Sequence, residues 1–180
     1  VHYAGNPCDM DSIHILSQKY GFKVVEDASH ALGATYKKVP NGGDNRSTAC
    51  IFSFHPVKMI TTGEGGALIL GCEEMFERAK RVRSHGINYL DNNHNIKKNR
   101  PWYYEQHELG YNYRITEMQA AMGIVQMSRL SSFLRKRNEL SKLYKEKLKN
   151  LPLKFQLVEG NSLCSYHLFT VKITDKKYER

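Results

Sequence analysis

The 180-residue sequence contains no apolar run longer than a few residues, whereas a helix that crosses a membrane needs roughly 20. No charged segment followed by an apolar one opens the chain, so no signal peptide is visible. The four cysteines show neither C-x-x-C spacing nor neighbouring histidines at zinc-ligand distances, which argues against the common zinc motifs. The sequence therefore predicts a cytoplasmic protein with reduced cysteines, no membrane span and no metal site.

An initial methionine is also missing, since the chain begins Val-His-Tyr-Ala-Gly. We therefore expect a fragment of a longer protein whose start lies upstream. The residues are 41% hydrophobic and 11% aromatic, and their regular spacing excludes a disordered chain. The length suits one domain or slightly more.

The formal net charge of +9 is compatible with nucleic-acid binding, but the positive residues are concentrated in one segment. Residues 129–149 hold eight Lys or Arg and two Glu, with leucines and aromatics at helical spacing. This pattern is typical of a long amphipathic helix whose basic residues face solvent. A nucleic-acid-binding module would need basic residues interleaved with exposed aromatics, and it is the alternative from a different class.

Helical segments are marked by caps and by apolar residues at helical spacing. Asp9 can cap a helix that ends at Gly21, and Thr116 with Gln119 forms a capping box that opens another. Two further helices are expected, at 73–84 and 129–149.

Strand-like runs occur between these helices, and the combination predicts an α/β fold. The expected strands are residues 22–26, 49–54, 66–70 and 166–173. Asp27 would stand just beyond the carboxyl end of the first strand, and the glycine-rich turn 63–66 would lead into the third. The polar segment 88–108 is long enough to suggest a functional or disordered loop.

Lys58 lies among apolar residues rather than the polar neighbours that are usual for a surface lysine. Pro56 opposes continuation of the preceding strand, so we expect Lys58 on a loop that leaves the sheet. Apolar surroundings would lower its pKa and allow the free amine to form a Schiff base with a carbonyl. The alternative is a lysine that extends its charge to solvent from a half-buried loop.

Two further features offer partners for such a lysine. Asp27 lies where ligands meet open α/β sheets, and it could keep the pyridine nitrogen of pyridoxal phosphate (PLP) protonated. The hydroxyls of Ser53, Thr61 and Thr62, with the amides of residues 63–66, suit a phosphate. Each also has an ordinary explanation, since Asp27 could cap a helix and the glycines could form a hairpin turn.

Three motifs occur in order: DASHALG at 27–33, FSFHPVKMITTGEGG at 52–66 and LGYNYRITEMQAA at 109–121. Together they closely resemble the DegT/StrS-type sugar aminotransferases, which are PLP enzymes that act on nucleotide-linked keto-sugars. The stretch WYYEQ at 102–106 resembles the branch that aminates a UDP-linked 4-keto-6-deoxy-N-acetyl sugar for pseudaminic acid. The resemblance covers nearly the whole chain.

The resemblance implies the aspartate-aminotransferase (type I) fold, an α/β domain with a mixed, mostly parallel sheet and flanking helices. Residues 1–128 would be part of this PLP-binding large domain, and residues 129–180 the connecting helix and the beginning of a small C-terminal domain. Relatives also have an upstream phosphate-binding turn, a ring that stacks on PLP and a longer C-terminal domain. The chain would therefore be the middle of a longer protein.

The resemblance also assigns roles to matching residues. Lys58 would be the catalytic lysine that bonds to PLP and moves a proton between substrate and cofactor. Asp27 would pair with the pyridine nitrogen, and His30 would hydrogen-bond the phenolic oxygen. Ser53 would bind the phosphate, and Asn112 would reach the phosphate of the neighbouring subunit's PLP. This last role implies a homodimer with shared active sites.

Arg114 and His167 would lie on the substrate side. The implied reaction moves an amino group from glutamate to a nucleotide-linked 4-keto-6-deoxy sugar. The alternatives within the family are a different keto-sugar or a relative that keeps PLP without turnover. A dehydratase branch carries His in place of the lysine, and Lys58 argues against it.

Overall fold

The computed structural model describes residues 1–88, 102–175 and 177. The chain forms two compact units, a first unit of Val1–Gly71 with Glu117–Arg180 and a second unit of Cys72–Thr116. Of the loop expected at 88–108, residues 89–101 lie outside the described residues.

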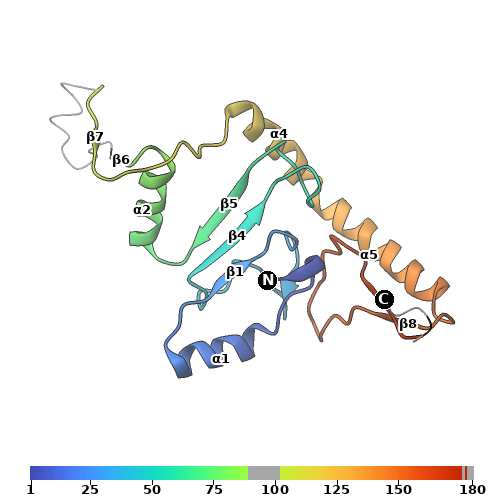
Figure 1. Cartoon of the computed structure of the whole chain (residues 1–180). Coiled ribbons are helices and arrows are strands. Elements are labelled where there is room, and N and C mark those ends of the chain that lie inside the picture. Colours follow the sequence, from blue (N-terminus) through green and yellow to red (C-terminus); the bar gives the residue numbers. More distant parts are fainter. Residues whose placement is uncertain (89–101, 176, 178–180) are drawn as a thin grey trace. The chain divides into compact units, whose positions relative to one another are not determined.

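The first unit contains a three-stranded sheet in the order β1-β4-β5 (Figure 1). Strand β1 (Val25–Asp27) pairs in parallel with β4 (Ala49–Ser53), and β4 pairs antiparallel with β5 (Gly66–Leu70). The sheet is mixed, as predicted. However, β1 starts later than expected and includes Asp27, because its pairing with β4 begins where Val25 lies opposite Ala49.

The remaining strands form short antiparallel pairs. In the first unit, β2 (Thr35–Tyr36) pairs with β3 (Val39–Pro40), and β8 (Leu153–Phe155) pairs with β9 (Val171–Ile173). In the second unit, β6 (Ile87–Asn88) pairs with β7 (Glu105–Gln106). The strand predicted over 166–173 is therefore limited to its last three residues. Tyr166 has a φ of 48°, which interrupts an extended strand.

The helices follow the sequence signals closely. Helix α1 (Met10–Tyr20) is capped by Asp9, whose side chain accepts a hydrogen bond from the Ser12 amide, and it ends at Gly21 with a φ of 71°. The others are the 3-10 turn η1 (Tyr3–Gly5), α2 (Glu73–Arg83), α4 (Glu117–Ser128) and α5 (Leu130–Lys147). Each helix in the described part of the chain is too short or too polar to cross a bilayer.

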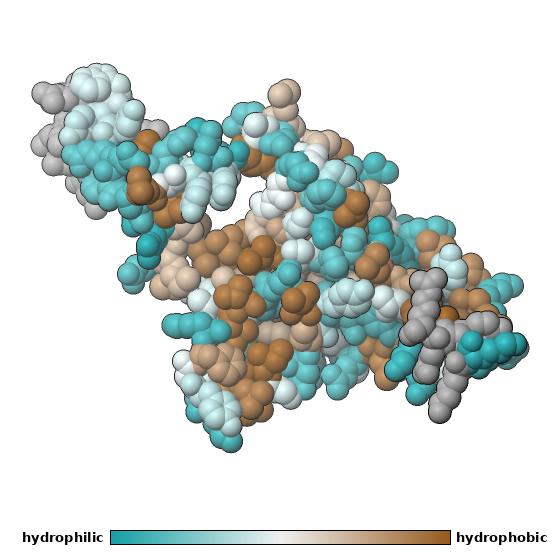
Figure 2. Space-filling model, in the orientation of Figure 1, coloured by the Kyte–Doolittle hydropathy of each residue, from teal (hydrophilic) through white to brown (hydrophobic). Residues whose placement is uncertain are grey.

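The two faces of the three-stranded sheet differ in burial. One face carries Cys50 and Phe52, which pack with three alanines of the segment after β1 (Ala28, Ala31 and Ala34). The other face carries Val25, Ile51 and Leu68, which are 57%, 41% and 50% exposed. Apolar residues are visible over the sheet in Figure 2.

Candidate active site

Two predicted site residues lie at the carboxyl edge of the sheet. Asp27 ends β1 and Ser53 ends β4, and the two strands run parallel. Lys58 follows on the loop between β4 and β5, as the position of Pro56 predicts. The sequence therefore brings a carboxylate, a hydroxyl and an amine out of the same edge, where α/β sheets bind their ligands.

The loop that carries Lys58 is held by its own backbone. The Phe54 amide donates to the Gly65 carbonyl (2.8 Å), and the buried Thr62 donates its amide to the Phe54 carbonyl (3.0 Å). Lys58 is half-buried, and its amide donates to the His55 carbonyl (2.9 Å). The lysine is thus presented from an ordered turn.

Two hydroxyls that the sequence offered for phosphate binding are used within this loop. The Gly63 amide donates to Thr61 Oγ1 (2.9 Å), and Thr62 Oγ1 donates to the Glu64 carbonyl (2.8 Å). These contacts favour the interpretation of the glycine-rich segment as a turn. Ser53 Oγ accepts a hydrogen bond from the His55 amide at 3.3 Å and is half-buried at the end of β4.

Asp27 is fixed through both its side chain and its backbone. Its Oδ1 accepts a hydrogen bond from the Ser29 amide (3.0 Å), and its carbonyl accepts one from the His2 amide (2.9 Å). The hydrogen bonds with Ser29 lower the pKa of Asp27. An ionised carboxylate in a fixed position is the group that a protonated pyridine nitrogen requires.

The charges of both Asp27 and Lys58 act on His30. Burial and the positive charge of Lys58 lower the pKa of His30, and the negative charge of Asp27 opposes them. The Ala4 amide donates to His30 Nδ1 at 3.3 Å, which requires a lone pair on that nitrogen. His30 is therefore neutral near pH 7, with its proton on Nε2.

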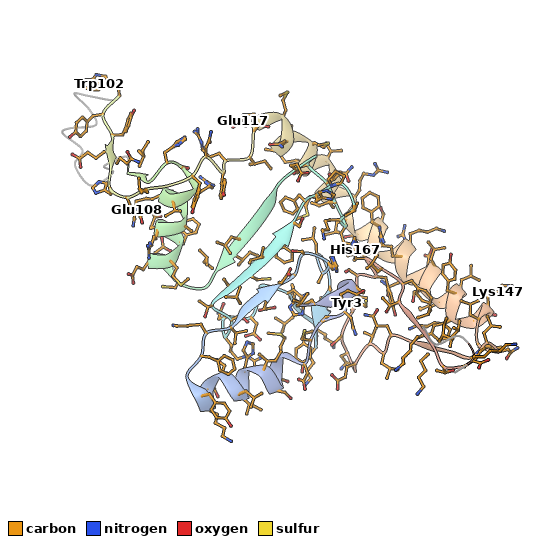
Figure 3. The ribbon with its side chains drawn as sticks, viewed as in Figure 1. Tyr3, Trp102, Glu108, Glu117, Lys147 and His167 are labelled. Carbon is orange, nitrogen blue, oxygen red and sulfur yellow. The ribbon has the colours of Figure 1, made fainter. Side chains whose placement is uncertain are left out.

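His167 joins this group from the C-terminal part of the chain. Its ring centroid is 4.4 Å from that of His30, and the ring centroid of Tyr3 is 6.0 Å from that of His30. Tyr3 and His167 are labelled in Figure 3. Burial lowers the pKa of His167 to about 4, together with the charges of His30, Lys58 and Arg137. His30 and His167 thus lie side by side, and the positive charge of Lys58 lowers the pKa of both rings.

Helix α5 holds the segment that carries His167. Arg137 Nη1 donates to the carbonyls of Tyr166 (2.9 Å) and His167 (3.2 Å), and Lys145 Nζ donates to the Tyr166 hydroxyl (3.1 Å). The expectation that the basic residues of this helix simply face solvent is therefore wrong for these two. The spacing of Arg137, Ser141 and Lys145 places them on one helical face, and the structure buries Ser141. In the sequence, the available signal was the small Ser141 four residues from each basic residue.

Asn112 and Arg114 belong to the second unit. Both are exposed, and the flanking residues are tied to the end of α2: the Tyr111 amide donates to the Val82 carbonyl (2.7 Å) and the Tyr113 amide to the Arg83 carbonyl (2.9 Å). The geometry of the first unit does not test their predicted roles. Both remain predictions.

A hollow of about 520 Å³ lies between the N-terminal turn and the β8–β9 pair. Tyr3, Cys8 and Phe155 contribute to its lining, but none of the predicted site residues does. The gathering of charged and titratable groups around His30 is therefore the stronger candidate for chemistry.

A lysine, an ionised carboxylate and a neutral histidine at the carboxyl edge of an α/β sheet suit PLP-dependent amino-group transfer. Residues 1–180 match the DegT/DnrJ/EryC1/StrS aminotransferase family, and the chain belongs to that family. It is 44% identical over 176 residues to the uncharacterized protein MJ1066 of Methanocaldococcus jannaschii, covering 96% of this chain and 44% of that protein.

Two other relatives carry functional names. The UDP-4-amino-4,6-dideoxy-N-acetyl-beta-L-altrosamine transaminase of Campylobacter jejuni is 41% identical over 179 residues, covering 99% of this chain and 45% of the transaminase. The structure of Helicobacter pylori PseC, an aminotransferase involved in the biosynthesis of pseudoaminic acid, matches with a TM-score of 0.84 and 31% identity, covering 98% and 45% of the two chains. The predicted family and type I fold are confirmed, and the chain spans less than half the length of these relatives.

Proposed function

We propose that the complete protein is a PLP-dependent aminotransferase that moves an amino group from glutamate to a UDP-linked 4-keto-6-deoxy-N-acetyl sugar, in pseudaminic acid formation. The observation that carries this proposal is the position of Asp27 and Ser53 at the carboxyl ends of the parallel strands β1 and β4, with Lys58 on the loop that follows β4. The names of the Campylobacter and Helicobacter relatives support the choice of sugar. A different nucleotide-linked keto-sugar is the alternative within the family.

The residues present fit PLP. Lys58 would bond to its aldehyde carbon, the ionised Asp27 would hold a proton on its ring nitrogen, and Ser53 would bind its phosphate. His30, with its proton on Nε2, can donate that proton in a hydrogen bond to the phenolic oxygen. PLP supplies an electron-accepting ring, and the chain supplies the proton carrier Lys58 and the fixed charge of Asp27.

The covalent role of Lys58 can be tested directly. Borohydride reduction of the full-length, PLP-loaded protein, followed by peptide mapping, should place the pyridoxyl label on Lys58. The Lys58→Ala variant should lose the label, whereas Lys19→Ala, which removes a lysine from the last turn of α1, should retain it. A label on any other lysine would overturn the assignment.

We also propose that residues 1–128 belong to the PLP-binding domain, that residues 129–180 begin the smaller C-terminal domain, and that two copies share their active sites. Asn112 of one copy would then contact the phosphate held by the other. Arg114, in the same motif, and His167, beside His30, would lie on the substrate side.

The shared site predicts complementation between inactive variants. A mixture of full-length Lys58→Ala with an inactive Asn112 variant should regain part of the activity, because both lesions fall in one site of the mixed dimer. Subunit exchange must be verified by mass spectrometry of differently tagged copies. If exchange occurs and no activity returns, the two residues belong to the same copy's site.

We further propose that the protein works in the cytoplasm. All four cysteines are free thiols, as expected in a reducing compartment. The alternative from a different class is a basic module that binds nucleic acid. Such a module would need the positive residues of α5 to face solvent and contact phosphates. Arg137 and Lys145 instead bind the segment that carries His167.

A further inference from the structure

The turn that contacts His30 has an unfavourable backbone conformation. Ala4, in the centre of η1, has a φ of 58° and a ψ of 9°, and it is completely buried. This left-handed conformation is disfavoured for any residue with a Cβ, and it persists only where the surroundings determine it. The amide that it orients is the one that donates to His30 Nδ1.

His2 anchors this turn from the adjacent position. Its Nε2 lies 2.8 Å from Glu26 Oε2, and only 1% of His2 and 4% of Glu26 is exposed. The His2 amide also donates to the Asp27 carbonyl (2.9 Å). Since Glu26 and Asp27 are consecutive in β1, their side chains point to opposite faces, and His2 connects the buried face with the backbone of the site.

The contact between His2 and Glu26 survives a change in the protonation of the ring. Burial lowers the pKa of His2, but hydrogen bonds with Cys8 and Glu26 outweigh it and raise the pKa to about 9. The Cys8 amide, which lies 3.0 Å from His2 Nδ1, can donate only to the neutral ring. In both forms a proton on Nε2 faces the Glu26 carboxylate.

We propose that His2 and Glu26 are positioning residues: their buried contact fixes the strained turn whose Ala4 amide keeps the proton of His30 on Nε2. The inference rests on the proposed function in that His30 faces the phenolic oxygen of the cofactor. Without the anchor, Ala4 relaxes to an ordinary backbone conformation and its amide leaves Nδ1. The His30 ring then divides between its two tautomers, and one of them presents no proton to the cofactor.

The tautomer can be measured without activity. In the full-length protein free of PLP, labelled with ¹⁵N-histidine, ring-nitrogen spectra should show His30 with a protonated Nε2 and a bare Nδ1. The signals are assigned by their loss in His30→Gln. The His2→Leu variant should move the His30 shifts toward a mixture of tautomers. The matched control is His107→Leu, which removes an exposed imidazole that also faces a glutamate (Glu105, 3.5 Å) but belongs to the second unit, and it should leave them unchanged.

A milder variant covers the case in which His2→Leu does not fold. Glu26→Gln keeps the size of the side chain and an acceptor, but it removes the charge. Amide exchange at Ala4 should then become about fivefold to tenfold faster, as expected when one buried hydrogen bond is weakened. The same amide should keep its wild-type exchange rate in His107→Leu.

The outcomes separate this inference from the proposed function. Unchanged His30 shifts in a folded His2→Leu protein, or unchanged Ala4 exchange in Glu26→Gln, would overturn the positioning role even if Lys58 is labelled as expected. If the shifts change as expected but Lys58 takes no label, the positioning of His30 stands and the assignment of the cofactor lysine fails.

Discussion

The two faces of the three-stranded sheet differ in what their side chains do: one face forms the buried core, and the other carries the candidate catalytic carboxylate. On the buried face, Phe52 and Cys50 pack against small residues, and Glu26, which is 4% exposed, bonds through its carboxylate to His2. On the other face, Asp27 holds its carboxylate at the end of β1 with a hydrogen bond from the Ser29 amide. Because successive residues of a strand point to opposite faces, the carboxylate of Glu26 is buried and that of its neighbour Asp27 is only half-buried.

This difference separates stability from chemistry. A substitution on the buried face removes packing, and its main cost appears in the free energy of unfolding. At the carboxyl edge, Asp27→Asn removes a charge but keeps an acceptor for the Ser29 amide, and its main cost appears in the rate. Unfolding and turnover, measured together in the full-length protein, therefore distinguish the two faces.

The largest effect on unfolding is expected for Phe52→Ala. Phe52 is 6% exposed in the core cluster, and loss of a buried phenylalanine ring costs about 3–5 kcal/mol. Urea unfolding measures the change, and the surviving folded protein should keep its turnover. Ile51→Ala, on the opposite face, should cost less because Ile51 is 41% exposed. Equal costs would mean that both faces are core in the complete protein.

The reverse behaviour is expected for Asp27→Asn. The amide cannot keep a proton on the pyridine nitrogen, so turnover should fall on the order of 10²-fold or more. The unfolding free energy should change little, because Asp27 is only half-buried. The half-buried Asp11, which pairs with Lys37, offers a control in Asp11→Asn. Turnover of Asp27→Asn near that of the control would contradict the proposed role.

Local signals predicted most of the fold. The Asp9 cap and the Gly21 stop gave α1 its observed limits, and the strand signals at 49–54 and 66–70 located β4 and β5 to within a residue. The failures were at β1 and β9, where the extent of a strand depends on its pairing partner. Val25 is opposite Ala49, and the φ of Tyr166 interrupts the expected last strand. Neither the pairing partner of β1 nor the backbone conformation of Tyr166 can be inferred from the local sequence.

The places of Asp27, Ser53 and Lys58 relative to the sheet were predictable, because Asp27 and Lys58 follow strand signals and Ser53 lies near the end of one. Their roles stay predictions. Tertiary contacts decided the rest: the Ala4 amide on His30 and the support of His167 by Arg137 join residues that are far apart in the chain. A basic residue on an amphipathic helix resembles a solvent-facing one until its partner is known.

The smallest predicted effect concerns the acid stability that His167 controls. Burial, with the charges of His30, Lys58 and Arg137, lowers the pKa of His167 from 6.5 to about 4 in the folded state. Between these values the unfolded chain binds more protons, so the folded state loses stability as the pH falls through 6.5, and the loss is complete below about 4. His30 acts in the same direction, because its pKa is also lowered. From about pH 7 to about pH 5, His167→Gln should therefore lose less unfolding free energy than the wild type, by on the order of 1–2 kcal/mol.

Urea unfolding at both pH values measures the difference, and His55→Gln, which removes an exposed ring, should behave like the wild type. Equal acid sensitivity in His167→Gln and the wild type would mean that the His167 ring carries a proton in the folded protein. The folded protein would then hold a second positive charge near that of Lys58, whereas the lowered pKa values of His30 and His167 indicate that both rings are neutral.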